Sequence, residues 1–64
     1  MKTTFVEMRV GAKFFTPSMA AHLLVKIGEN EAVTYHDGKK VAVPNVHLRV
    51  ECITPLMVDE RKTK

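Results

Sequence analysis

Histidine and cysteine are the residues of this chain with the most specific chemistry, and two of the three histidines are expected to face each other. His22 and His36 occupy opposite positions on two predicted strands, where Cβ atoms lie about 4.5–5.5 Å apart. Two imidazoles at that separation can share a metal ion. A third ligand would have to be His47 or Asp37, and the chain has no C-x-x-C or H-x-x-x-H spacing. We therefore prefer two solvated histidines near a turn and keep a metal site at His22 and His36 as the alternative.

The single cysteine, Cys52, is the other candidate for chemistry. Alternation along the last predicted strand turns Cys52 inward and His47 outward. This argues against a nucleophilic Cys/His pair, which needs an exposed thiolate beside its base, and favours a small core residue. The sequence also lacks a G-x-S-x-G elbow, a P-loop and an HExxH motif. We predict a protein that is not an enzyme, has no catalytic residues and needs no cofactor.

The length of the chain, 64 residues, predicts one small domain, which we place at 1–55, followed by a charged tail at 56–64. A domain of this size buries only about 60% of its unfolded surface, so its core is marginal. One cysteine rules out an internal disulfide, which leaves self-association as a further source of stability, and it fits a reducing compartment. No signal peptide or run of about 20 apolar residues is present. We therefore predict a cytoplasmic protein without membrane contact.

Period-two alternation predicts a β-meander in the middle of the chain. Its strands are expected at about 22–27, 31–36 and 39–43, with turns at 28–30 and 36–38. The first turn sets Val25 opposite Val33.

The turn at Asp37-Gly38 decides the register of the second hairpin. A two-residue loop would place Val33 opposite Ala42 and divide the large apolar residues between two faces. A three-residue loop places Val33 opposite Val41 and gathers them on one face, and register follows the buried face. We predict the three-residue loop, with Gly38 in the left-handed conformation of a G1 bulge.

The two turns together assign one face of the meander to the core. The residues expected to point inward are Leu23, Val25, Ile27, Val33, Tyr35, Val41 and Val43. The residues expected on the outer face include Leu24, Lys26, Thr34 and Lys40. This outer surface would be small, partly apolar and rimmed with basic groups.

Two further alternating segments complete the predicted fold. A strand at about 46–53 directs Val46, Leu48, Val50 and Cys52 inward, and a strand at 5–10 directs Val6, Met8 and Val10 inward before continuing at 12–16. Five short strands joined by tight turns hide their apolar face by curling on themselves. We predict an all-β fold, either a small barrel or a strongly curved antiparallel sheet.

Several short segments that are typical of small β-barrels follow one another along the chain. They are Val10-Gly11-x-Lys13-Phe14, Leu24-Val25-Lys26-Ile27, Ala32-Val33, Asp37-Gly38-Lys39 and a closing Val-x-x-x-Val strand. Over about residues 5–53 this order resembles small SH3-like β-barrel proteins, many of them from phages and prophages. The resemblance implies a five-stranded SH3-like barrel in the host cytoplasm. It also implies a phage-type accessory role that modulates or inhibits a host or defence complex. The stretch 18–21 departs from the Gly-containing turn that such proteins often have.

A net charge of +3 permits nucleic acid as a partner. Small barrels bind single strands with a basic groove and stacking aromatic rings. Only one of Phe14 and Phe15 can point inward, which leaves one or two rings for stacking. The residues assigned to this alternative are Lys26, Lys39, Lys40 and Arg49.

A protein partner is the preferred interpretation. A small sheet offers an edge for strand addition or a face for docking, and apolar residues that the core does not use would mark the interface. The residues assigned to it are Leu24, Lys26, Thr34, Lys40, Ile53, Leu56 and Met57. A homo-oligomer that covers the same residues is the remaining alternative.

Overall fold

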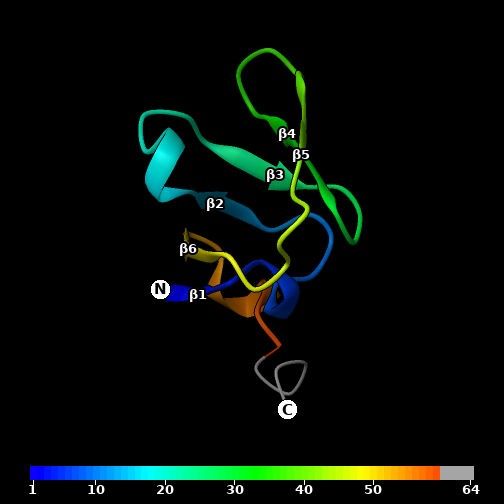
Figure 1. Ribbon diagram of the computed structural model, residues 1–64. Helices are drawn as coiled ribbons and strands as arrows, with labels where there is room; N and C mark the ends of the chain where they lie inside the picture. The colour runs from blue at the N-terminus through cyan, green and yellow to red at the C-terminus, as the bar shows by residue number, and fades with distance from the viewer. Residues whose placement is uncertain (60–64) are drawn as a thin grey trace.

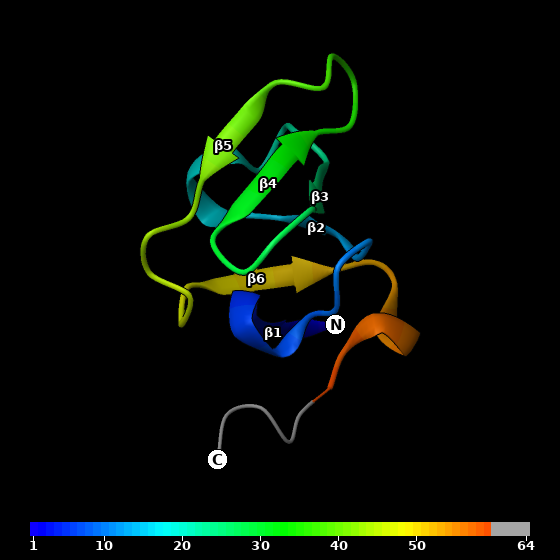
Figure 2. The ribbon, with the colours of Figure 1, turned by 90° about the vertical axis from the view of Figure 1, so that its right-hand side faces the viewer.

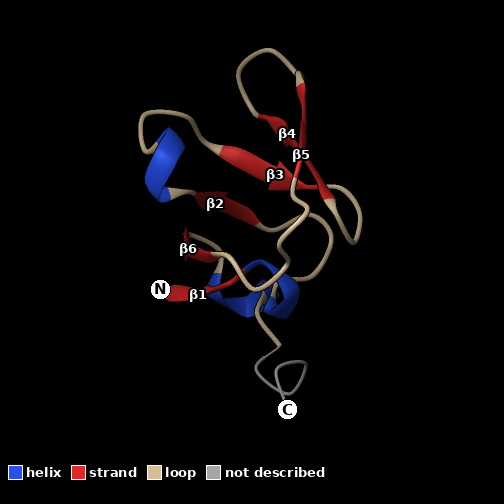
Figure 3. Ribbon diagram, viewed as in Figure 1, coloured by secondary structure: helices blue, strands red, loops and turns tan. Residues whose placement is uncertain are grey.

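The computed structural model describes residues 1–59, and these residues form an all-β fold, as predicted (Figures 1 and 3). The strands are β1 (Lys2–Thr4), β2 (Lys13–Phe15), β3 (Leu24–Lys26), β4 (Glu31–Thr34), β5 (Lys40–Ala42) and β6 (Arg49–Cys52). Three short 3₁₀ helices accompany them: η1 (Phe5–Glu7), η2 (Pro17–Met19) and η3 (Pro55–Met57).

The strands form one antiparallel sheet in the order β1-β6-β2-β3-β4-β5. In Figure 2 the sheet twists from β5 and β4 at one end to β6 and β1 at the other. The expected five-stranded barrel is not what the described residues form, because β1 adds a sixth strand and β1 and β5 remain separate edges. The sequence pattern missed β1 because Lys2 to Thr4 are polar, and their strand is stabilised by pairing with β6.

An aromatic pair fills the centre of the core. Phe5 and Phe14 are fully buried, and their rings meet edge to face with centroids 5.6 Å apart and an interplanar angle of 74°, a favoured arrangement. Gly11 turns the chain into this core with a φ of 101°, which glycine adopts readily. The remaining buried apolar residues are Met8, Ala12, Leu24, Ala32, Val43, Val50 and Cys52.

The hairpin of β3 and β4 has the predicted register. Val25 lies opposite Val33. The N–H of Ile27 donates to the carbonyl of Glu31 at 3.1 Å and closes the turn at 28–30. The prediction for this turn is confirmed.

The hairpin of β4 and β5 differs from the prediction by one residue. Val33 lies opposite Lys40 rather than Val41, and the N–H of Thr34 donates to the carbonyl of Lys39 at 2.9 Å. The loop between the strands is therefore four residues long, and the predicted three-residue loop is wrong.

Side-chain hydrogen bonds stabilise this longer loop. The hydroxyl of Thr34 donates to the carboxylate of Asp37 and accepts the N–H of Lys39. Gly38 has a φ of 69°, so its predicted left-handed conformation is confirmed. Hydropathy alternation does not detect such local hydrogen bonds, which compete with the shorter turn.

The inner face of β3 and β4 is the one that was predicted to face outward. Leu24, Lys26 and Thr34 are buried, with at most 8% of their surface exposed. Tyr35 is 61% exposed and Ile27 is 39% exposed. The residues Leu23, Val25 and Val33 are only partly buried. The predicted face assignment is wrong for these two strands.

Lys26 explains how the inversion is tolerated. Its side chain crosses the core, and its ammonium Nζ donates to the carbonyl oxygens of Phe5 at 2.9 Å and Met8 at 2.7 Å. The same ammonium lies 4.5 Å from the centroid of the Phe5 ring, a cation–π distance. A buried charge is tolerated when it is hydrogen-bonded in this way. The hydrogen bonds of Lys26 thus connect β3 to η1 and the residue that follows it.

The last strand follows its predicted alternation. Val50 and Cys52 are buried, and Arg49 and Glu51 are exposed. Val46 and Leu48 pack partly buried against the core. The inward orientation predicted for this segment is confirmed.

The segment 5–10 is not a strand. Its first three residues form η1, Met8 is buried as predicted, and Val10 is exposed rather than inward. The carboxylate of Glu7 accepts the hydroxyl of Thr3 and both the hydroxyl and the N–H of Thr4. These bonds favour a turn at the end of β1 over a continued strand.

The predicted tail begins inside the fold. Met57 and Val58 pack against the core, and Met8 forms a β-bridge with Val58. The residues 60–64 of the predicted tail lie outside the described part of the chain. Within residues 1–59, the structure contains no helix that is long and apolar enough to cross a membrane.

Candidate protein-interaction surface

The outer face of β2, β3 and β4 carries a continuous set of apolar side chains. Lys13 pairs with Val25, and Val25 pairs with Val33, so these positions share one face. Side chains two residues along each strand point to the same side. We define the apolar outer face as Phe15, Leu23, Val25, Ile27, Val33 and Tyr35.

Lysines flank the central valines of this face. Lys13 on β2 and Lys40 on β5 lie at the two ends of a row that crosses Val25 and Val33. The ammonium of Lys13 lies 5.1 Å from the centroid of the Tyr35 ring. Lys13 lies on β2 and Tyr35 directly follows β4, on the other side of β3. This contact shows that their side chains meet over the outer face.

The partly accessible apolar outer face has an energetic consequence. Covering apolar surface is worth about 25 cal/mol per Å², and scattered apolar side chains on a surface need no explanation. Here they are adjacent on three paired strands rather than scattered. Two of them, Ile27 and Tyr35, are exposed, and the others are partly buried. Adjacent apolar side chains that remain accessible in this way are typical of an interface.

The edge strand β5 offers main-chain groups next to this face. The hydrogen bonds from Thr34 N–H to Lys39 and from Val43 N–H to Asn30 define which pairs of the β4–β5 ladder are hydrogen-bonded. In an antiparallel pair, the intervening residues direct their N–H and C=O groups away from the partner strand. Those intervening residues include Lys40 and Ala42, so β5 presents an edge that a further strand can pair with.

The other edge, β1, is partly blocked. The N–H of Thr4 donates to the carboxylate of Glu7 at 3.2 Å, and the chain turns into η1 directly after this residue. Charge and a local turn at an edge discourage strand addition. The β5 edge is therefore the better site for a partner strand.

A hollow of about 370 Å³ lies where β1, β6 and the start of η2 meet. Its lining residues are Lys2, Phe15, Thr16, Pro17, Ala20, Arg49, Val50 and Glu51. The carboxylate of Glu51 pairs with the amino group of Met1, and this hydrogen bond lowers the pKa of Glu51. Phe15 belongs to both the hollow and the apolar outer face. A second hollow of about 250 Å³ lies between η2 and the chain that joins β5 to β6.

The residues predicted to bind a protein are divided by the structure. Leu24, Lys26 and Thr34 are buried in the core and are unable to contact a partner. Lys40 is exposed beside the apolar outer face, and Ile53 is 49% exposed near β2, where its N–H donates to the carbonyl of Lys13. The other two predicted residues lie elsewhere, on η3: Leu56 is 91% exposed and Met57 packs against the core.

The residues predicted to bind nucleic acid do not converge. Lys26 is buried, while Lys39 and Lys40 lie at the start of β5. Arg49 lies on β6, which three other strands separate from β5 in the sheet. A strand of nucleic acid needs a continuous basic path, and these four residues do not form one.

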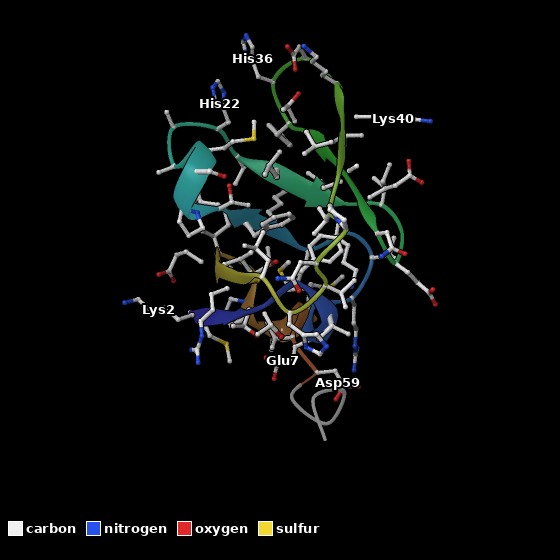
Figure 4. All side chains as sticks on the ribbon, viewed as in Figure 1. Lys2, Glu7, His22, His36, Lys40 and Asp59 are labelled. Atoms are coloured by element: carbon white, nitrogen blue, oxygen red, sulfur yellow. The ribbon has the colours of Figure 1, made fainter. Side chains whose placement is uncertain are left out.

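The two histidines project from the same end of the molecule, above β3 and β4 (Figure 4). Both are exposed. In the described part of the chain, no group of three histidine, cysteine, aspartate or glutamate side chains is arranged to hold a metal ion. The imidazole pair thus has no third ligand among those residues.

The candidate surface that sequence reasoning missed is the apolar outer face itself. The prediction grouped Leu23, Val25, Val33 and Tyr35 correctly on one face but assigned that face to the core. One signal pointed the other way: the segment 5–14 contains Phe5, Met8 and Phe14, enough large apolar residues to fill a small core without them. A face left over by such a core is available for a partner.

A scan against protein-family models, a search of curated proteins and a search of solved structures each found no significant match.

Proposed function

We propose that this protein is a non-enzymatic module that binds another protein through its apolar outer face and the adjoining β5 edge. The observation that carries the proposal is the row of Val25 and Val33, side by side on paired strands and only partly buried, next to the exposed ring of Tyr35. Aromatic and aliphatic residues at the centre of a patch with polar groups at its rim are typical of protein interfaces.

The charges around the face favour a partner of a particular kind. Lys13 and Lys40 flank the apolar row, and complementary charges steer association and set specificity. A partner surface with an apolar centre and acidic groups beside it fits this arrangement. Homo-oligomerisation through the same face would bring the lysines of the two copies close together, and the repulsion between their like charges would disfavour that contact.

The finer description of the fold and the biological role belong to the same proposal. The run of strands β6-β2-β3-β4-β5, to which β1 is added, supports an SH3-like scaffold. The resemblance to phage and prophage proteins supports a cytoplasmic accessory protein that modulates or inhibits a host or defence complex.

Affinity capture with paired variants tests the proposal. Tagged wild-type protein and the double variant Val25→Thr/Val33→Thr are compared in a cell lysate, with and without nuclease, and bound proteins are identified by mass spectrometry. Threonine keeps the β-branched shape that suits a strand, so loss of capture reports the surface. Leu56→Thr, a change of the same kind on exposed η3, is the matched control.

We expect one partner that survives nuclease, is lost with the double variant and is retained by the control. Capture that disappears with nuclease would instead support nucleic acid as the partner. Equal capture by wild type and the double variant would contradict the proposed surface.

A further inference from the structure

We propose that the hollow between η2 and β6 binds the C-terminal residue of a partner chain. The apolar side chain of that residue would occupy the hollow, and its α-carboxylate would lie between Lys2 and Arg49. This inference rests on the proposed protein-binding function and adds a second, separate site to it.

The lining of the hollow favours an apolar side chain, and its volume is large enough to hold one. Its volume of about 370 Å³ is at the lower end of the range of about 300–1,000 Å³ for ligand sites. Phe15, Pro17, Ala20 and Val50 contribute apolar surface to its wall. An apolar side chain therefore fits the hollow best, because it loses no hydrogen bonds to water when it is buried there.

The charges at the rim select a carboxylate. Lys2 lies opposite Glu51 in the β1–β6 pairing, and Arg49 lies two residues from Glu51 on the same face. Such diagonal neighbours are about 7–8 Å apart, within reach of long side chains. Glu51 already accepts the amino group of Met1 and is attracted by the charge of Lys2 opposite it, whereas within residues 1–59 Arg49 has no ion-pair partner. The rim is thus net positive, and an arginine binds a carboxylate with two parallel hydrogen bonds.

A C-terminal residue supplies both groups from one Cα atom. The apolar wall and the two cations border the same hollow, so an occupant needs an apolar side chain and a carboxylate close together. An internal aspartate or glutamate carries its carboxylate on the side chain and leaves the hollow to a neighbouring residue. Phe15 links the hollow to the apolar outer face, so one partner is able to cover both.

Nuclear magnetic resonance with the full ¹⁵N-labelled chain tests this site. The probe is the peptide acetyl-Gly-Ser-Leu with a free C-terminal carboxylate, compared with the same peptide ending in an amide. We expect saturable shifts of the backbone amides of Lys2, Thr16, Ala20 and Arg49, and at least tenfold weaker binding of the amide. Equal binding of the two peptides, or shifts confined to other residues, would overturn the proposal.

Variants of the protein separate the charge from the shape of the hollow. Arg49→Gln is expected to weaken binding of the free peptide about tenfold, which corresponds to about 1.4 kcal/mol. Ala20→Phe is expected to abolish it by filling the hollow, because Ala20 is exposed there. Lys39→Gln removes an equal charge at an exposed position before β5 and is expected to leave binding unchanged. Unchanged binding by both Arg49→Gln and Ala20→Phe would contradict the site.

Two further probes decide the source of the carboxylate. Octanoate that binds as tightly as the peptide would assign the hollow to free carboxylic acids and overturn the C-terminal assignment. Acetyl-Ser-Asp-Leu-amide that binds equally well would assign it to internal acidic segments and also overturn it. Failure of the free peptide to bind, with lysate capture still lost in Val25→Thr/Val33→Thr, would refute the hollow and leave the proposed function intact.

Discussion

On β3 and β4, the more polar face of the sheet is buried and the more apolar face is only partly buried. The inner face of β3 and β4 contains Lys26 and Thr34, both buried. The outer face of the same strands contains Val25 and Val33, both only partly buried. The difference teaches that the core of this small domain is organised around large residues outside the meander, while the more apolar side of the meander remains available for binding.

Polar groups are tolerated on the inner face because each is hydrogen-bonded. Lys26 donates to two backbone carbonyls, and Thr34 donates to Asp37 and accepts from Lys39. Among the residues that the structure describes, no buried side-chain nitrogen or oxygen lacks a partner. Satisfied polar groups carry little penalty, so the inner face is stable despite its composition.

The sharpest contrast in stability is expected between two adjacent phenylalanines. Phe14→Ala removes a fully buried ring that packs against Phe5, and such changes cost about 3–5 kcal/mol. Since a domain of this size gains only about 3–5 kcal/mol from its core, we expect the variant to be largely unfolded at room temperature by circular dichroism. Phe15→Ala, on the outer face, is expected to remain folded. Similar melting curves for the two variants would contradict the assignment of faces.

The second contrast concerns two lysines. Lys26→Met keeps the aliphatic chain but removes the ammonium donor from the carbonyl of Met8, while the carbonyl of Phe5 still accepts the N–H of Met8. A buried acceptor that loses its donor costs about 1–3 kcal/mol, and we expect a loss of this size in urea denaturation. Lys40→Met, on the exposed side, is expected to change stability by less than about 0.5 kcal/mol. A stable Lys26→Met variant would show that the ammonium is not needed in the core.

A smaller effect is expected in the loop that sets the β4–β5 register. Gly38→Ala places a side chain at a φ of 69°, where L residues are disfavoured by about 1–2 kcal/mol. We expect a loss of about 1 kcal/mol, measured by thermal unfolding. Gly28→Ala is the control, since a Cβ there meets no atom within 4 Å and no left-handed φ is required. Equal effects of the two substitutions would argue against the left-handed conformation of Gly38.

The smallest effect is a change in titration. The hydroxyl of Thr34 donates to Asp37 and lowers the pKa of that carboxyl below its ordinary value of 3.8. A lowered folded-state pKa contributes stability that is present above pH 3.8 and is lost as the pH falls through the folded pKa. In Thr34→Val we expect the pKa of Asp37 to rise toward 3.8, measured by carboxyl resonances in nuclear magnetic resonance. An unchanged pKa would show that this hydrogen bond does not form in solution.

The sequence predicted features that depend on local patterns. Alternation located β6 and the burial of Cys52, and glycine chemistry identified the left-handed Gly38. The turn at 28–30 and the pairing of Val25 with Val33 followed from the same reasoning.

The sequence did not predict features that depend on distant contacts. The burial of Lys26 requires carbonyls of Phe5 and Met8, about twenty residues away along the chain, and no periodicity encodes them. The β4–β5 register depends on the side chain of Thr34 rather than on hydropathy. The members of the candidate surface on and beside β3 and β4 were therefore grouped correctly but assigned to the wrong face. Val41 and Val43, which were predicted to share that face, lie against the core instead.

Lysine acetylation of the native protein tests the inversion of the two faces most directly. The folded chain is treated briefly with an acetylating reagent, and modification at Lys26 and Lys40 is compared by mass spectrometry. The account predicts rapid modification of Lys40 and strong protection of Lys26, which reacts at a similar rate only after unfolding in urea. Equal native rates would place Lys26 in solvent, return Val25 and Val33 to the core, and remove the proposed binding surface.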